Sequence, residues 1–366
     1  MSHSLEDMRA AKQALSGRYL QRFLEAPEMA VFATRSVAAA MTQASHNVHA
    51  VGIGLKVVEG KPTSALSILM YVTNKLPESM LAPIDRLPET IDGVPVDVIE
   101  SPPAMIVAGR ARKRKPAGRS PRPPKAAATQ ACSTRRRERQ RPVMGGISAA
   151  HHTVTAGTIS CFCRSTRSAD GAAVFALSNN HVFADVNKAK IGSDLYQPGP
   201  MDGGTPNDRL ATLERFVRIV LGPDGSNKVD GAIGRLLDGV KFDPAICSIG
   251  NIKGTEAAKP GMRVHKHGRT TGLTAGIVAA IDYDAVIGMD HSDSSVLAKF
   301  SDQMRIEAGP GNPPFGLGGD SGSLVLSTPG DRAVGLYFAG PQSGSYGIAN
   351  QIADVLKDLE ITLLQA

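Results

Sequence analysis

Two kinds of hydrophobic pattern divide the chain. From about residue 143 onward, short apolar runs alternate with Gly, Pro, Asn and Asp. Short runs bounded by turn residues are typical of strands, and their succession predicts an all-β barrel or sandwich. Near the C-terminus the spacing changes, because apolar residues recur at helical intervals from Ile348 to Leu359. This spacing predicts a terminal helix.

The first hundred residues have a different character. Ala, Leu, Met, Gln and Arg dominate from Leu5 to about Ala44, and an Ala-Pro break at 26–27 predicts two helices there. Strand-like runs follow at 48–58, 65–72 and 94–99, and the Gly-Ile-Gly at 52–54 favours a bulged strand over a nucleotide-binding loop. Residues 1–105 are therefore predicted to form a small α/β domain. Oligomerisation, adaptor binding and control of the rest of the chain are all open as its role.

A strongly basic segment separates these two parts. Residues 110–141 contain thirteen Lys or Arg and one acid, a net charge of +12, whereas the whole chain carries +7 and the remainder therefore −5. Such a segment buries too little apolar area to offset its ordering entropy, which predicts a disordered linker over 106–142. It would either contact an anionic partner, such as nucleic acid, anionic lipid or an acidic protein, or serve as a soluble spacer.

Cysteine usage and the N-terminus bear on the compartment. The four cysteines are Cys132, Cys161, Cys163 and Cys247. So few cysteines, without zinc-site spacing, indicate a reducing compartment, with Cys161 and Cys163 as buried thiols. The first residues lack the features of a signal peptide, and no apolar run could form a transmembrane segment. We therefore expect a cytoplasmic protein, with a homo-oligomer left open.

One serine stands in a sequence context suited to catalysis. Ser321 lies within Gly-Gly-Asp-Ser-Gly-Ser at 318–323, immediately before the apolar run 324–326. A serine hydroxyl needs a neighbouring base and backbone N–H donors for the oxyanion, and glycines allow those N–H groups to converge. The alternative is a simple turn between strands.

A histidine and an aspartate could complete such a site. His181 follows the apolar run 174–177 at the point where a strand ends, a usual place for catalytic side chains, although a core histidine is the alternative. Asp230 stands before Gly-Ala-Ile, which predicts a buried carboxylate able to orient an imidazole. The other candidates for that acid are Asp185, Asp202, Asp208, Asp224 and Asp238.

These motifs resemble those of trypsin/chymotrypsin-like serine proteases, in which His, Asp and Ser occur in this order. Gly-Asp-Ser-Gly-Ser at 319–323 resembles the nucleophile motif, with Ser where many members have Gly. The segment 177–182 resembles the histidine motif of bacterial members, and 267–274 resembles a second-barrel segment of streptogrisins. The whole arrangement is similar to bacterial relatives of the plant Narrow leaf 1 protein, which carry an α/β region ahead of the protease domain.

The resemblance implies a fold and a reaction. Residues 143–366 would form a chymotrypsin-like double six-stranded β-barrel with a C-terminal helix. The activity would be that of a serine endopeptidase acting on protein or peptide substrates, with no cofactor and no metal. Ser321 would be the nucleophile, His181 the base and Asp230 the orienting acid. The backbone N–H groups of Gly319 and Ser321 would form the oxyanion hole.

The resemblance also implies a substrate pocket. Its residues would be Phe315, Phe338, Ala339 and Gly340. The last three lie on a strand that in this clan also pairs with the substrate backbone. Members that cleave after Lys or Arg carry an acid about six residues before the nucleophile, where this chain has Phe315. We therefore expect a small or apolar P1 residue.

Two questions stay open at this level. Trypsin-like zymogens are activated when a new N-terminus pairs with the Asp before the serine, here Asp320. The Val-Met-Gly-Gly at 143–146 is either such a start or, as we expect, a bend before the first barrel strand. A second function class is a catalytically silent scaffold or nucleic-acid-binding protein acting through its basic linker. The complete His, Asp and Ser set argues against it.

Overall fold

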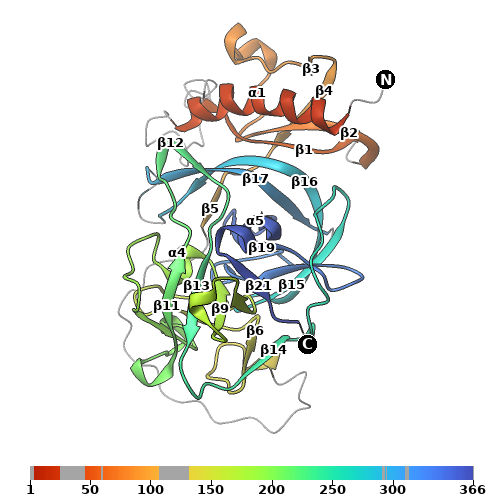
Figure 1. Ribbon diagram of the computed structural model, residues 1–366. Coiled ribbons are helices and arrows are strands. Elements are labelled where there is room, and N and C mark those ends of the chain that lie inside the picture. The colour runs from red at the N-terminus through yellow and green to blue at the C-terminus, as the bar shows by residue number, and fades with distance from the viewer. Residues whose placement is uncertain are drawn as a thin grey trace.

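The computed structural model describes residues 4–24, 46–58, 61–106, 132–290, 293, 295–309 and 313–365. The second predicted helix and most of the basic linker lie outside these residues. Within them the chain is mainly β, which confirms the predicted fold class. In Figure 1, α1 and β1–β4 lie at one end of the molecule and β9, β11 and β13 lie toward the other. The long strands β16 and β17 cross the space between them.

The larger of two main sheets contains twelve of the described strands. Its order is β12-β17-β20-β19-β18-β15-β16-β1-β2-β4-β3, and β5 pairs with both β16 and β19. Its strands from the N-terminal part are β1 (Val48–Val58), β2 (Lys61–Val72), β3 (Thr90–Ile91), β4 (Val94–Glu100) and β5 (Ala104–Ile106). The others are β12 (Gly222–Asn227), β15 (Arg263–Gly268), β16 (Gly272–Gly288), β17 (Leu297–Ala308), β18 (Leu324–Ser327), β19 (Ala333–Gly340) and β20 (Tyr346–Gln351).

The second sheet has the order β21-β8-β9-β13-β11-β10-β7. Its strands are β7 (Ala150–His151), β8 (Phe162–Ser165), β9 (Val174–Ser178), β10 (Asp194–Tyr196), β11 (Arg209–Phe216), β13 (Ala232–Leu236) and β21 (Ile361–Leu363). A separate pair joins β6 (Val143–Gly145) to β14 (Phe242–Ile246). The short helix α4 (Asn180–Phe183) directly follows β9 and carries His181.

The N-terminal elements follow the predicted pattern. Helix α1 spans Leu5–Leu24, and β1, β2 and β4 cover the three strand-like runs. The predicted bulge is present, because the register of β1 against β16 shifts between Val51 and Ile53. Strand β1 pairs antiparallel with β16, so these elements continue the larger sheet. The apolar face of α1 packs into the same core cluster as β16 and β17.

The C-terminal helix is shorter than its periodicity predicts. Helix α5 spans Ile352–Asp358, whereas Tyr346–Gln351 forms β20. Ile348 pairs with Ala339 of β19 and with Arg305 of β17, so the start of the predicted helix is wrong. An apolar run buried on both faces has no clear period, and its strand partners are distant in sequence.

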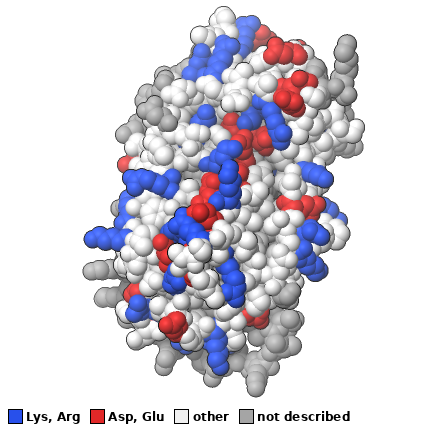
Figure 2. Space-filling model, viewed as in Figure 1, with Lys and Arg blue, Asp and Glu red and all other residues white. Residues whose placement is uncertain are grey.

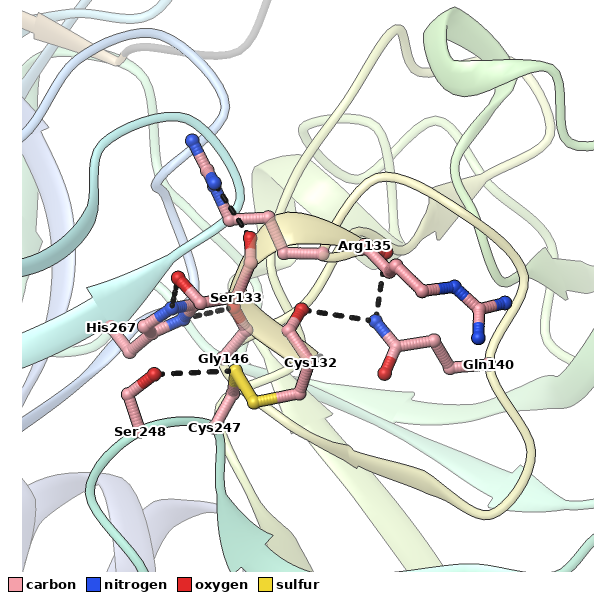
Figure 3. The surroundings of a disulfide bond; sticks show 9 residues. Cys132, Ser133, Arg135, Gln140, Gly146, Cys247, Ser248 and His267 are labelled. Carbon is pink, nitrogen blue, oxygen red and sulfur yellow. Dashed lines mark hydrogen bonds between the residues drawn. A yellow bond between two sulfur atoms is a disulfide. The ribbon is translucent and has the colours of Figure 1, made fainter. Parts of the chain in front are cut away.

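The end of the basic segment has a defined place. Residues 132–134 form a helical turn, and a disulfide joins Cys132 to Cys247 (Figure 3). We call residues 132–142 the strap. A disordered linker was expected here, because the composition allows little apolar burial. The disulfide reduces the conformational entropy that the strap loses on ordering, so less burial is needed to order it. Cys161 and Cys163 are free and buried, as predicted.

The disulfide also weakens one inference about compartment. Disulfides are rare in reducing compartments. Because two of the four cysteines form a disulfide, the small number of cysteines no longer supports a reducing compartment. No described helix is long and apolar enough to span a bilayer.

The strap arginines bind to the protein itself. Arg135 pairs with Glu138 and Arg139 pairs with Asp208. Arg136 donates to the main-chain carbonyls of Arg269 and Thr270, at 3.1 Å each. These contacts commit this part of the basic segment to the protein itself. On the face shown in Figure 2, basic and acidic side chains are interspersed among neutral ones.

Candidate active site

His181 and Asp230 are in direct contact. The Nδ1 atom of His181 lies 2.5 Å from Oδ2 of Asp230, and the His181 backbone N–H donates to Oδ1 at 3.1 Å. Both side chains are completely buried. With its carboxylate fixed at two points, Asp230 holds the imidazole in one orientation. The other ring nitrogen, Nε2, is buried and has no hydrogen-bond partner among the described residues.

The backbone around Asp230 is itself anchored. Its N–H donates to Oδ1 of Asn350 at 3.1 Å, and its carbonyl accepts from Nδ2 of Asn179 at 2.7 Å. Asn350 in turn donates to Oε1 of Gln303 at 2.6 Å. These amides join the end of β9 to β20 and β17, so elements from both sheets position the carboxylate.

Three of the other candidate acids have different partners, and the side chain of Asp224 lies outside the described residues. Asp185 accepts from Thr153, Asp202 pairs with Arg269, and Asp208 accepts from Thr205. Asp238 is exposed. Of the aspartates with described side chains, Asp230 alone is hydrogen-bonded to His181.

Ser321 lies in a bend that requires glycine. Gly319 and Gly322 have φ values of +94° and +96°, and a Cβ at Gly322 would clash with the carbonyl oxygen of Thr158. The Ser321 hydroxyl donates to the carbonyl of Phe338 at 3.3 Å, longer than the roughly 2.7–2.8 Å usual for such a bond. No hydrogen bond within the described residues uses the backbone N–H of Gly319 or Ser321.

Thr158 connects the serine bend to the strand that leads into His181. Its N–H donates to the Ser321 carbonyl, and its hydroxyl donates to the Gly319 carbonyl, each at 2.8 Å. Its own carbonyl accepts from the hydroxyl of Ser178, the last residue of β9, at 2.8 Å. The two halves of the candidate site therefore meet at one residue.

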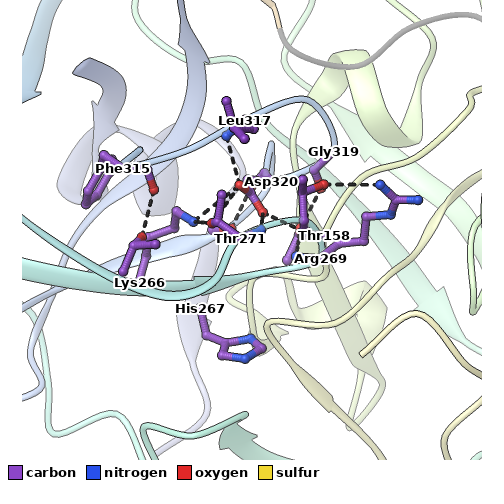
Figure 4. Close-up of polar contacts among 12 residues, drawn as sticks. Thr158, Lys266, His267, Arg269, Thr271, Phe315, Leu317, Gly319 and Asp320 are labelled. Carbon is purple, nitrogen blue, oxygen red and sulfur yellow. Dashed lines mark hydrogen bonds and ion pairs between the residues drawn. The ribbon is translucent and has the colours of Figure 1, made fainter. Parts of the chain in front are cut away.

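Asp320 is surrounded by donors (Figure 4). Oδ1 accepts from the N–H of Thr270 at 2.7 Å and of Thr271 at 3.1 Å. Oδ2 accepts from the Thr271 hydroxyl at 2.8 Å and from the N–H of Leu317 at 2.9 Å. Nζ of Lys266 lies 3.4 Å from Oδ2, with both side chains fully buried. Burial lowers the pKa of Lys266, and the charge of Asp320 opposes that shift.

The alternative interpretation of 143–146 as an activation start does not supply a partner for Asp320. Val143 is an internal residue of β6, and its N–H donates to the carbonyl of Lys241. Gly146 has a φ of +81°, which makes the bend expected there. The positive charge facing Asp320 is Lys266, a residue of β15.

The predicted pocket residues divide between two apolar clusters. Phe315 is buried against Tyr337, with ring centroids 5.9 Å apart, and its ring lies 5.7 Å from Nζ of Lys266. Phe338 and Ala339 belong to another cluster, in which Phe338 contacts Phe300. Gly340 ends β19. The role of these residues in a single pocket stays a prediction.

Three important residues were missed from the sequence: Thr158, Lys266 and Asn350. Lys266 carried a usable signal, because alternation along β15 places it on the same face as Val264, a core residue. Its neighbours are explained locally, since His265 pairs with Asp331 and His267 bonds to the carbonyl of Gly146. Thr158 and Asn350 carried no comparable signal.

Comparisons with known proteins add one relative in sequence. No family model matches the chain. The Protein NARROW LEAF 1 of Oryza sativa subsp. japonica is 24% identical over 319 residues, which cover 79% of this chain and 50% of that protein. The chain thus spans about half the length of the curated relative it matches.

Solved structures with a similar arrangement include several proteases. Thermobifida fusca Protease A is 16% identical with a TM-score of 0.41, covering 61% of this chain and 99% of its own. Cellulomonas bogoriensis chymotrypsin has the same identity, TM-score and coverage. A glutamic acid specific serine protease, titled as using a novel histidine triad in substrate binding, is 18% identical with a TM-score of 0.43. It covers 61% of this chain and 100% of its own.

Proposed function

We propose that this protein is a serine endopeptidase that cleaves peptide bonds through an acyl-enzyme. The observation that carries the proposal is the buried contact of His181 Nδ1 with Asp230 Oδ2 at 2.5 Å. That contact leaves Nε2 of His181 without a partner among the described residues. A buried imidazole with one nitrogen fixed by a carboxylate and the other available is suited to act as a general base.

In this mechanism Ser321 attacks the scissile carbonyl while His181 takes the hydroxyl proton. The proton then passes from His181 to the leaving amine, and water releases the acyl group by the same route in reverse. Asp230 stabilises the imidazolium that forms. The long bond from Ser321 to the Phe338 carbonyl supports this assignment, because a weakly held hydroxyl can turn toward the base at little cost.

The oxyanion would be held by the backbone N–H groups of Gly319 and Ser321. Support comes from the positive φ of Gly319 and from the absence of a hydrogen bond to either N–H within the described residues. Thr158 donates to the carbonyls of Gly319 and Ser321, so the two backbone N–H groups of this bend are held in place before the reaction. Such prearranged donors contribute roughly 10²- to 10³-fold each to the rate.

The arrangement of Asp320 supports a site that needs no activating cut. A new N-terminus is unnecessary where a buried lysine and four hydrogen-bond donors already satisfy the carboxylate. A small or apolar P1 preference remains our expectation from Phe315, where trypsin-like enzymes carry an acid.

Labelling with a fluorophosphonate probe tests the proposal. The probe phosphonylates an activated serine, so the parent protein should be labelled and the Ser321→Ala variant should not. Ser323→Ala is a matched control, because it removes a neighbouring buried hydroxyl that donates to the Asp320 carbonyl. Equal labelling of the parent and Ser321→Ala would refute the assignment.

A further inference from the structure

Strand β5 runs along β19 beside the candidate nucleophile. The two strands are antiparallel, with Ile106 opposite Ala339 and Met105 opposite Gly340. The residue before Ala339 is Phe338, whose carbonyl accepts the Ser321 hydroxyl. Ile106, the last residue of β5, is therefore opposite the residue that follows Phe338. Neighbouring strands lie about 4.8 Å apart, so β5 ends close to the carbonyl that accepts the Ser321 hydroxyl.

Strand β5 is held firmly on both sides. It also pairs in parallel with β16, with Ala104 opposite Ile287. The side chains of Ala104 and Ile106 are 1% and 4% exposed and belong to the same cluster as Phe338 and Ile348. The carbonyl of Pro102, just before β5, accepts from the Tyr346 hydroxyl at 2.7 Å. The edge of β19 next to Ser321 is therefore occupied by the chain itself.

This occupation coincides with a closed site. Ser321 is 0% exposed and His181 is 2% exposed. Extended peptides bind to sheets by adding one strand to a free edge, where main-chain hydrogen bonds give affinity and alternate side chains enter pockets. A peptide that reached Ser321 along β19 would need the positions that Met105 and Ile106 now hold.

We propose that β5 is an internal occupant of the substrate-binding edge, and that substrate binds only when β5 leaves it. This inference rests on the proposed protease function and names the substrate class. The substrate is an extended peptide that replaces β5 in the antiparallel ladder. Small and aliphatic side chains fit the buried positions of Ala104 and Ile106, whereas charged ones would lie in an apolar cluster.

Two changes in β5 test the proposal by different means. Ile106→Asp places a charge in the apolar cluster, and Met105→Pro removes an N–H from the strand and fixes its backbone. If β5 blocks the site, either change raises the open fraction, so the fluorophosphonate should label both variants at least about tenfold faster than the parent. Val94→Asp is the matched control, since Val94 is 1% exposed in the same sheet but lies on β4. It should label at the parent rate.

The outcomes separate this inference from the protease proposal. If the parent labels as fast as both β5 variants, β5 does not block the site, and the inference fails while the protease proposal stands. If no protein labels, the protease proposal fails. Urea unfolding of each variant shows whether it is folded.

A measurement on the parent protein needs no variant. A tripeptidyl diphenyl phosphonate with an aliphatic residue next to phosphorus would form a P–O bond to Oγ of Ser321, release phenol and extend along β19. Hydrogen–deuterium exchange of the backbone amides of residues 104–106, followed by mass spectrometry, should then rise severalfold relative to the free protein. Covalent attachment without a change in that exchange would overturn the inference.

Discussion

At the scale of single residues, the candidate site depends on how each carboxylate is satisfied. Asp230 faces an imidazole and Asp320 faces an ammonium group, and both carboxylates are buried. A buried charge is stable only when it is paired and hydrogen-bonded. Substitution can therefore measure the role of each pair: that of His181 and Asp230 in turnover, and that of Lys266 and Asp320 in stability.

Asp230→Asn should reduce turnover by about 10⁴-fold, the size of effect known for the orienting Asp of Ser-His-Asp proteases. The amide can donate to Nδ1 of His181, which leaves the imidazole in the wrong tautomer. Hydrolysis of a peptide substrate gives the measurement, once one has been found by screening. Asp238→Asn, which changes an exposed aspartate, serves as control and should retain the parent rate. A near-normal rate for Asp230→Asn would mean that another acid orients His181.

Lys266→Met should lower the free energy of unfolding by about 3 kcal/mol, because it leaves the Asp320 carboxylate buried without its cation. Urea denaturation measures the change. Lys228→Met is the control, since Lys228 pairs with Asp302 at 2.6 Å on the surface, with 53% of its side chain exposed. Exposed pairs contribute at most about 1 kcal/mol. Equal effects of the two substitutions would contradict a structural role for the buried pair.

At the scale of elements, two short segments, the strap and β5, pack next to the candidate site. The strap places Arg136 against the carbonyls of Arg269 and Thr270, and the N–H of Thr270 binds Asp320. Strand β5 pairs with the last two residues of β19. The strap is attached covalently through Cys132, whereas β5 is held by strand pairing and by the burial of Ala104 and Ile106.

Reduction of the disulfide should destabilise the protein by about 2–4 kcal/mol, since the bond closes a loop of 115 residues in the unfolded chain. Thermal melting with and without dithiothreitol measures the effect. The Cys132→Ser/Cys247→Ser double variant should melt at the lower temperature under both conditions. A parent protein that melts identically with and without the reductant would contradict the prediction.

At the scale of the whole molecule, the N-terminal part and the barrel share a polar and aromatic junction. Arg305 of β17 lies over the rings of Tyr71 and Tyr346, at 4.2 and 3.5 Å from their centroids. Beside it, a ring nitrogen of His49 contacts the carbonyl of Ser101 at 2.9 Å. Burial lowers the pKa of His49 to about 3, and the nearby charge of Arg305 adds to that shift.

This buried imidazole should make the fold sensitive to acid. Because the unfolded chain binds a proton near pH 6.5 and the folded one does not, stability falls as the pH drops below 6.5. Between pH 7 and pH 5 the parent should lose about 2 kcal/mol more than His49→Gln, as measured by urea denaturation. His152→Gln, at an exposed imidazole, should keep the parent's pH dependence. If the free energy of unfolding falls equally for the parent and His49→Gln between pH 7 and pH 5, the prediction is wrong.

The sequence by itself determined the local features of this protein. Turn-bounded apolar runs predicted β1, β2 and β4 and the mainly β class, because side-chain alternation and turn chemistry act over a few residues. The same local context singled out His181, Asp230 and Ser321. The contact of His181 with Asp230 was expected from the residues that flank Asp230 together with the resemblance to trypsin-like proteases.

Only the tertiary structure decided which distant segments meet. Lys266 faces Asp320, Cys132 bonds to Cys247, and β5 lies on β19. Each of these contacts joins positions far apart in the chain, and no periodicity or local propensity encodes such a pairing. Residues 348–351 of strand β20 were mistaken for part of a helix for the same reason, since their strand partners lie in β17 and β19. Pairing and burial together override local preference at these positions.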